Sequence, residues 1–307
     1  MFRVPRHPSL WGIDLGGTKI EGAIIDPDAP TIARHRVRLP TEGDRGYAHI
    51  LARVESIVAM LEAASGERRP SVIGIGTPGT LEPSTQLLKN SNTVALNGRP
   101  LGRDVSAASG VDARLSNDAN CFALAEATLG AARGHAVVLG LIIGTGVGSG
   151  IVVNGRVLDG RHGIAGEWGH NPLCGESTPC YCGRSGCVET VISGPALERF
   201  YREHAGEARP LAEIVRRADA GDDTAAATLG RLIEKFGEAI AAVINIVNPD
   251  AIVIGGGVGN VDHLYQPATR ASIERYLFNP TLETALLRPS LGDSAGVFGA
   301  ALLARPT

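Results

Sequence analysis

The sequence IDLGGTKIEGAII, at residues 13–25, sets the fold of this chain. An apolar run ends at Asp14, two glycines follow, and a second apolar run covers residues 20–25. Short apolar runs beside glycines are typical of buried strands, so the stretch predicts a strand, a glycine turn and a second strand. The pattern returns as LIIGTGVGSGIVV at residues 141–153, again with a threonine in the turn. A duplicated hairpin, one per domain, would place two glycine turns across one cleft.

Hydrophobic periodicity extends the prediction to the rest of the chain. It predicts helices at 47–64, 119–131, 231–247 and 294–303 and strands at 10–14, 20–25, 72–75, 113–115, 136–143, 150–153 and 251–254. Asn154-Gly155 predicts a tight turn after the second hairpin. Because hairpins alternate with strand–helix units, we expect the α/β fold class with two domains.

Composition excludes several classes of protein. The chain has 307 residues, 44% of them hydrophobic, which is enough for a large core, and its net charge of −3 gives no electrostatic case for nucleic acid. The longest apolar run, at 136–143, is too short to span a membrane, and the N-terminus lacks the apolar core of a signal peptide. Three of the five cysteines are clustered, which fits a metal in a reducing, cytoplasmic setting better than a disulfide framework.

Three glycine turns carry groups that bind phosphate. DLGGTK, at 14–19, offers backbone amides, a hydroxyl and an ammonium group, GTGVG at 144–148 repeats the glycine spacing, and a third turn, 255–257, follows a predicted strand. Glycines let backbone N–H groups approach an anion closely. The first turn is not a dinucleotide fingerprint, because a strand-like run follows it, and the chain has no Walker A motif. Asp14 either holds Mg²⁺ through water or caps its turn.

Four possible zinc ligands lie together in GEWGHNPLCGESTPCYCGRSGCVE, at residues 166–189. They are His170, Cys180, Cys182 and Cys187. Three thiolates and an imidazole close a tetrahedral site, and a closed site stabilises structure rather than doing chemistry. The alternative is a set of buried or solvated cysteines in a glycine-rich loop.

Acidic residues flank this loop and open a predicted helix. Glu167 and Glu189 lie on either side of the cysteines, and with His170 they are what the loop would present to a substrate. Asp118 follows Asn117 where a strand ends and a helix begins. A helix N-terminus favours a capping side chain, so capping and acceptance of a sugar hydroxyl proton both remain open for Asp118.

Taken together, these motifs resemble the ROK family of repressors, open reading frames and kinases over nearly the whole chain. The motifs are DLGGTK at 14–19, GTPG at 76–79, NDANCFALAEA at 117–127, GTGVGSG at 144–150, GEWGH at 166–170, CYCGRSGCVE at 180–189 and IGGGV at 254–258. The resemblance implies an actin-like, hexokinase-type (ribonuclease H-like) fold with an interdomain cleft. It implies a smaller domain at 1–118, onto which a helix at about 294–307 packs back, and a larger domain at 119–293 with the zinc loop.

The resemblance also implies an ATP-dependent sugar kinase with Mg²⁺, a structural Zn²⁺ and a homodimeric state. Asp118 would be the catalytic base. The sugar ligands would be Gly79, Asn117, Asp118, Glu167, His170 and Glu189, with the metal on His170, Cys180, Cys182 and Cys187. The ATP phosphates would lie on Asp14, Gly16, Gly17, Thr18, Lys19, Gly144, Thr145, Gly146, Val147, Gly148, Gly255, Gly256 and Gly257. One ring nitrogen of His170 would bind the metal and the other would reach the sugar.

The sugar is predicted from finer resemblances. Residues 87–104 and 255–266, with GEWGHNPL, look like the fructokinase (manno-fructokinase) branch, so fructose is the expected substrate. NDANCFALAEA is shared with N-acetylglucosamine kinases, which stay an alternative beside glucokinases, mannokinases and a non-catalytic sugar sensor. A repressor would need a DNA-binding domain ahead of Asp14, and a zinc hydrolase or dehydrogenase an open metal position; we expect neither. Cys174 is expected to be a bystander and Cys121 a core residue.

Overall fold

The computed structural model describes residues 9–26 and 29–305 and divides them into two compact units. Unit 1 comprises the described residues up to Arg133, the segment Gly155–Ala165 and the described residues from Ser290 onward. Unit 2 comprises Gly134–Asn154 and Gly166–Pro289. Unit 1 therefore includes the helix that starts at Asp118, which the sequence analysis placed in the second domain. As a division into domains, the boundary after residue 118 stays a prediction.

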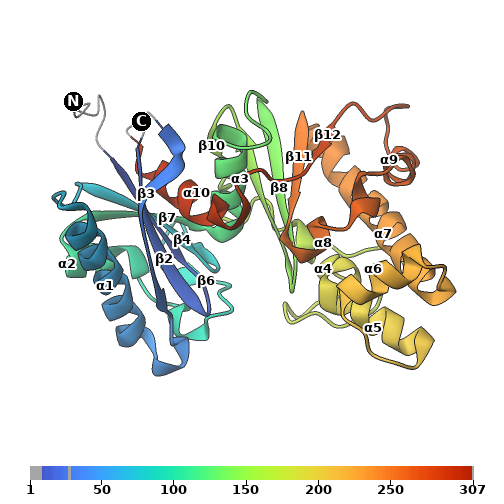
Figure 1. The fold of residues 1–307 in the computed structure, drawn as a ribbon, viewed down its shortest axis with the longest axis horizontal. Helices are drawn as coiled ribbons and strands as arrows, with labels where there is room; N and C mark the ends of the chain where they lie inside the picture. The colour runs from blue at the N-terminus through green and yellow to red at the C-terminus, as the bar shows by residue number, and fades with distance from the viewer. Residues whose placement is uncertain (1–8, 27–28, 306–307) are drawn as a thin grey trace. The chain divides into compact units, whose positions relative to one another are not determined.

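The first sheet, in unit 1, is built outward from the first hairpin (Figure 1). Its strands are β1 (Leu10–Leu15), β2 (Lys19–Asp26), β3 (Ala29–Pro40), β4 (Val72–Thr77) and β7 (Asp112–Asn117), in the order β3-β2-β1-β4-β7. The β1–β2 and β2–β3 pairs are antiparallel, whereas β4 pairs parallel with both β1 and β7. The predicted hairpin is thus extended by a predicted parallel strand on one side and by β3, which was not predicted, on the other.

Two helices pack closely against this sheet. In α1 (Tyr47–Ser65) the buried residues repeat at helical spacing as Ile50, Val54, Ile57, Val58 and Leu61. The helix α10 (Ala295–Leu303), red in Figure 1, contacts β1, β4 and α3 (Asp118–Thr128). A Cβ atom at Gly74 would overlap the backbone of Ala300, so glycine is required where α10 approaches β4. The predicted terminal helix is confirmed as far as Leu303, and residues 306–307 lie outside the described residues.

The second sheet repeats the plan of the first. Its strands are β8 (Val137–Ile143), β9 (Val147–Val153), β10 (Arg156–Val157), β11 (Ala251–Gly255) and β12 (Ala285–Leu287), in the order β10-β9-β8-β11-β12. The β8–β9 pair is antiparallel, and β11 pairs parallel with β8. Asn154 and Gly155 both have positive φ (49° and 74°), as the predicted tight turn requires. The duplicated hairpin is therefore confirmed.

The long helix α7 (Asp223–Val247) supplies much of the core of unit 2. Leu232, Phe236, Ile240 and Ile244 are buried along one face, as the sequence predicts. Further helices are α2 (Leu101–Ser109), α4 (Glu189–Ile192), α5 (Gly194–Ala205), α6 (Leu211–Asp219), α8 (Gly256–Gly259) and α9 (Pro267–Glu274), and β5 (Thr80–Leu81) pairs with β6 (Leu88–Lys89). Within the described residues, no helix is long and apolar enough to cross a membrane.

Candidate functional site

Asn117, rather than Asp118, is the capping residue of α3. The Asn117 side chain accepts hydrogen bonds from the amides of Ala119 and Asn120, at 2.8 and 3.4 Å. Its Nδ2 donates to the Gly79 carbonyl at 3.4 Å, which brings together two of the predicted sugar ligands. Asp118 is exposed at the first position of the helix, where its Oδ1 also accepts from the Ala119 amide at 2.8 Å. The helix cap does not require a carboxylate at 118.

Gly79 lies at a position that only glycine fits. Its φ is +81°, and a Cβ there would come within 2.8 Å of the Ser91 amide nitrogen. The turn after β4 can therefore close against Ser91 only without a side chain at residue 79.

The first glycine turn is held by a buried threonine. The Gly16 amide donates to the Lys19 carbonyl at 2.9 Å, which closes the turn between β1 and β2. Thr41, fully buried, donates its amide to the Thr18 carbonyl at 2.9 Å and its hydroxyl to the Gly16 carbonyl at 2.7 Å. Thr41 thus occupies the carbonyls of the turn, whereas Gly17, Thr18 and Lys19 remain exposed. Exposed amides beside a hydroxyl and an ammonium group suit a phosphate.

Asp14, just before this turn, lies in an acidic surrounding. A Cβ at Gly296, in the first turn of α10, would come within 2.9 Å of the Asp14 carboxylate. The pKa of Asp14 is raised to about 6, by burial first and then by the carboxylates of Asp118 and Glu21, while Lys19 opposes this rise. Two carboxylates that oppose each other's ionisation suit a hard divalent cation, since Mg²⁺ prefers oxygen ligands. Asp14 therefore fits the magnesium role that the sequence analysis left open for it.

In unit 2, the second and third glycine turns lie together. The Gly144 amide donates to the Gly146 carbonyl at 2.9 Å and closes the turn between β8 and β9. Gly256, directly after β11, has a φ of +82°, and a Cβ there would overlap the carbonyl of Ile143. A Cβ at Gly257, by contrast, would meet nothing within 4 Å. The backbone of the third turn therefore requires glycine at residue 256. A side chain at residue 257, by contrast, would enter open space.

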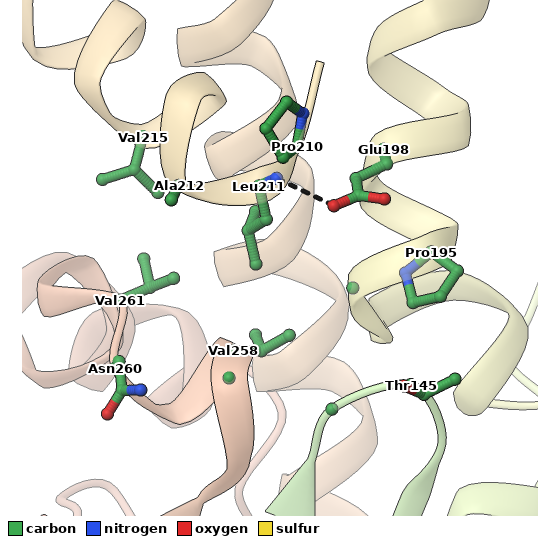
Figure 2. Close-up of a pocket in the computed structure, with 13 residues that line it drawn as sticks. Thr145, Pro195, Glu198, Pro210, Leu211, Ala212, Val215, Val258, Asn260 and Val261 are labelled. Atoms are coloured by element: carbon green, nitrogen blue, oxygen red, sulfur yellow. Dashed lines mark hydrogen bonds between the residues drawn. The ribbon is translucent and has the colours of Figure 1, made fainter. Parts of the chain in front are cut away.

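These two turns border a cavity of about 710 Å³ within unit 2 (Figure 2). Figure 2 shows Thr145 on the hairpin turn, with Leu211 and Val258 among the apolar side chains that line the space. The other lining residues are Gly144, Gly194, Pro195, Glu198, Pro210, Ala212, Val215, Gly257, Asn260 and Val261. An apolar wall with amide-bearing turns at one end suits a flat base attached to phosphates.

The GEWGH segment contacts the second hairpin and α7. Trp168 is buried and donates its indole N–H to the Ala239 carbonyl of α7 at 3.1 Å, and the Ser149 hydroxyl of β9 donates to the Gly166 carbonyl. These contacts hold Gly166 and Trp168, the two neighbours of Glu167, and so fix the position of Glu167. Burial raises the pKa of Glu167, His170 lowers it and Glu189 raises it. The three predicted sugar ligands of unit 2 thus lie within one electrostatic neighbourhood.

Glu189 has a contact that the sequence did not predict. Its Oε2 accepts a hydrogen bond from the Val147 amide at 2.9 Å. A Cβ at Gly146 would come within 2.7 Å of the same oxygen. The carboxylate that was predicted only to bind sugar therefore also ties α4 to the second glycine turn.

The predicted metal ligands form one cluster. The ligand atoms of His170, Cys180, Cys182 and Cys187 lie within 4.8 Å of one another. Cys182 and Cys187 are 3.6 Å apart at sulfur, and Cys180 Sγ is 3.6 Å from His170 Nδ1. A tetrahedral ion with Zn–S bonds of about 2.3 Å separates two sulfurs by about 3.8 Å, so the donor set fits zinc. The metal itself stays a prediction.

The loop backbone is already shaped to hold an ion. The Cys180 amide donates to the Arg184 carbonyl at 2.7 Å, and the Gly183 amide donates to the Cys180 carbonyl at 3.0 Å. A hydrogen bond from the Arg184 backbone leads the effects that lower the pKa of Cys182, which favours the thiolate that a metal needs. Cys174 is exposed and outside the cluster, as expected of a bystander, and Cys121 is buried in the core.

Residues from distant segments complete the candidate site and were not predicted. Thr41 supports the first turn, Tyr181 contacts His170, and the cavity wall comes from the starts of α5 and α6. Glu198 accepts from the Leu211 amide at 2.8 Å and joins those two helix starts (Figure 2). Tyr181 lies inside the quoted CYCGRSGCVE motif, but no local motif marks the other residues, because their neighbours come from other parts of the chain.

Comparison with known proteins gives one family. The model of the ROK family matches residues 10–307. A curated N-acetyl-D-glucosamine kinase from Pectobacterium carotovorum is 36% identical over 304 residues, which cover 95% of this chain and 98% of that relative.

Two solved structures agree with this family. A ROK hexokinase from Thermus thermophilus is 34% identical with a TM-score of 0.86, over 97% of this chain and 98% of the other. A ROK glucokinase from Streptomyces griseus, in complex with glucose and AMPPNP, is 27% identical with a TM-score of 0.78, over 97% and 99%. The hexokinase-type two-domain α/β fold that the sequence predicts is thereby shown.

Proposed function

We infer that this chain, which belongs to the ROK family and is a sugar kinase, transfers the terminal phosphoryl group of ATP to N-acetyl-D-glucosamine. The relative at 36% identity over almost the full length supports this choice of sugar. The comparisons support this alternative better than the fructokinase reading, which they do not confirm. Fructose, glucose and mannose become the competing substrates in the test.

Asp118 is the residue that we assign as general base. The observation that carries this assignment is that Asn117 provides the helix cap, so capping alone does not explain the carboxylate at 118. The Ala119 amide orients that carboxylate, and the side chain is exposed to a substrate. A base held in this way accepts the proton of the sugar hydroxyl as that oxygen attacks phosphorus.

ATP binds along the glycine turns in this proposal. The apolar wall of the 710 Å³ cavity takes the base, and Gly144 and Gly257 at its border let the phosphates approach the backbone. Asp14 would hold Mg²⁺, whose charge would stabilise the phosphoryl group during transfer. What remains for the chain's own residues is to orient the sugar hydroxyl and to take its proton.

Zinc has a structural role in this proposal. The four ligands fill a tetrahedral site, so no position is left for a reacting molecule. The ion would fix Glu167, His170 and Glu189, which bind the sugar hydroxyls. A cytoplasmic location and a homodimeric state stay predictions.

Replacing the base tests the proposed function. Asp118→Asn keeps the side-chain size and should lower kcat by about 10² to 10⁴-fold, because only the proton acceptor is lost. The Kd for N-acetyl-D-glucosamine, measured by calorimetry, should stay within about threefold of the wild-type value, since hydrogen bonds to the sugar can still form.

The matched control is Asp112→Asn, an exposed aspartate at the start of β7, the strand that leads to Asp118. It should leave kcat unchanged. A near-normal kcat in Asp118→Asn would show that the base has been assigned wrongly.

A further inference from the structure

Glu198 is the one charged residue among the 13 that line the 710 Å³ cavity of unit 2. The other lining residues are glycines, prolines and aliphatic residues, with Thr145 and Asn260 as the neutral polar side chains. The cavity is proposed to hold a nucleotide, whose phosphates are negatively charged. A carboxylate in its wall would repel the phosphates, so it suits a neutral part of the ligand that donates hydrogen bonds.

The helix α5 carries Glu198 away from the phosphate-binding turn. The Gly194 amide, at the start of α5, donates to the Gly144 carbonyl at 2.8 Å, so the helix begins against the second glycine turn. Glu198 follows one helical turn later, about 6 Å along the axis. Figure 2 shows Thr145, Pro195 and Glu198 in this order along one side of the cavity. The carboxylate therefore lies one helical turn beyond the amides that are proposed to bind phosphate.

The side chain of Glu198 is held in place and keeps one oxygen available. It is half-buried, and its Oε1 accepts a hydrogen bond from the amide of Leu211, the first residue of α6, at 2.8 Å. This bond satisfies an amide at a helix start that would otherwise lack a partner. Among the described residues, Oε2 has no hydrogen-bond partner. A fixed acceptor of this kind loses little conformational entropy when it binds a donor.

The ribose is the part of a nucleoside triphosphate that fits this acceptor. In the proposed function, the glycine turns bind the phosphates and the apolar wall takes the base. The ribose joins these two parts, and its neighbouring 2′- and 3′-hydroxyls are both hydrogen-bond donors. Hydrogen bonds to an ionised acceptor are shorter and stronger than those between neutral groups.

We propose that Glu198 binds the ribose of the nucleotide: its carboxylate accepts hydrogen bonds from the 2′- and 3′-hydroxyls, while the Leu211 amide holds the carboxylate in place. Glu198 then selects ribonucleotides over 2′-deoxyribonucleotides as phosphoryl donors. The inference rests on the proposed function for the placement of ATP in this cavity.

The wild-type chain gives the first test, through the choice of nucleotide. When Mg-2′-deoxy-ATP replaces Mg-ATP, with N-acetyl-D-glucosamine as the acceptor, the KM for the nucleotide should rise about 10-fold. The kcat should change little, because the lost hydrogen bond forms equally in the ground state and in the transition state. Equal KM values for the two nucleotides would overturn the inference.

Glu198→Gln separates the charge from the helix contact. Its side-chain carbonyl can still accept from the Leu211 amide, so the start of α6 keeps its partner. The KM should rise about 8-fold for ATP and about twofold for 2′-deoxy-ATP, so the preference for ATP falls from about 10-fold to about 2.5-fold. An equal rise for both nucleotides would show that Glu198 only supports α6, and would contradict the inference.

Glu203→Gln is the matched control. Glu203 is an exposed glutamate of the same helix and lies outside the cavity lining, so both KM values should stay at the wild-type level. Mg-ITP provides a second arm, because it keeps the ribose and lacks the 6-amino donor of adenine. If Glu198→Gln relaxed discrimination against ITP instead of discrimination against 2′-deoxy-ATP, the carboxylate would contact the base, and the ribose assignment would be wrong.

Binding measurements distinguish this inference from the proposed function. A wild-type chain that releases no ADP with any sugar would contradict the kinase assignment. Calorimetry with ADP and 2′-deoxy-ADP on the same variants would then still test the contact, and binding of neither nucleotide would overturn it. A chain that phosphorylates the sugar with 2′-deoxy-ATP as well as with ATP would contradict the ribose contact alone.

Discussion

Asp14 and Asp118 show how far a single residue can be interpreted from sequence. The motifs place both aspartates at turns, but capping and chemistry explain them equally well at that level. The structure resolves part of this choice, because Asn117 provides the cap of α3 and because the pKa of Asp14 is raised to about 6. Glu126 shows the converse case. It lies in a quoted motif, yet its buried carboxylate receives the amides of Ala131, Ser290 and Leu291, which no local pattern foretells.

The raised pKa of Asp14 predicts a pH-dependent stability. The carboxyl pKa rises from 3.8 to about 6 on folding, so the folded chain binds more protons than the unfolded chain between these values. The contribution of Asp14 to stability is therefore fully present below about pH 4 and is lost as pH rises through about 6. The cost at pH 7.5 is about 2 kcal/mol, allowing for partial screening by solvent.

Asp14→Asn should remove this cost. Without added Mg²⁺, its free energy of unfolding relative to the wild type should rise by about 2 kcal/mol between pH 4 and pH 7.5, as measured by urea titration. Comparing the two proteins at each pH cancels the other titrating groups. A difference that does not change with pH would show that the Asp14 environment has been described wrongly.

At the scale of elements, repetition and periodicity were strong guides. The two hairpins and the faces of α1 and α7 follow from apolar spacing, because burial of one face dominates their stability. Strand β3 was missed although arginines at 34, 36 and 38 alternate with half-buried residues, a pattern that alternation along a strand explains. The wall of the 710 Å³ cavity could not be predicted, since its residues meet only after α5, α6 and α8 have packed.

The cysteine loop predicts a clear effect of metal loss. Cys182→Ser should lower the zinc content from about one ion per chain and raise the KM for sugar about 10-fold or more, because the loop no longer fixes its sugar ligands. Mass spectrometry of the purified protein and steady-state kinetics measure the two effects. Cys174→Ser is the matched control, since both cysteines are exposed and only Cys182 belongs to the cluster. Full zinc content and normal kinetics in Cys182→Ser would contradict the metal site.

The third glycine turn separates structure from binding. In Gly257→Val the new side chain enters open space at the border of the cavity, where the nucleotide is proposed to bind. The variant should therefore raise the KM for ATP about 10-fold, which corresponds to a steric cost of about 1.4 kcal/mol. The melting temperature should hardly change. Gly230→Val, in α7 with equally open space, is the control and should leave the KM for ATP unchanged. An unaffected KM in Gly257→Val would place the nucleotide elsewhere.

At the scale of the whole molecule, the sequence predicted the family and the fold, whereas the preferred sugar stays a proposal. Most of the motifs that mark the family lie in turns and in the cysteine loop, and the turns need particular residue types for geometric reasons, as Gly79 and Gly256 illustrate. The sugar is chosen by small differences among polar groups that many hexoses could satisfy. The likeness of a few segments to the fructokinase branch is therefore a weaker argument than 36% identity over 95% of the chain.

The most direct test of this account is ADP release by the purified chain with Mg-ATP and one sugar at a time: N-acetyl-D-glucosamine, glucose, mannose or fructose. The account predicts that kcat/KM for N-acetyl-D-glucosamine exceeds that for fructose by about 10-fold or more, because polar groups that pair with an acetamido group would be left unpaired with fructose. A chain that prefers fructose, or that releases no ADP with any of the four sugars, would contradict it.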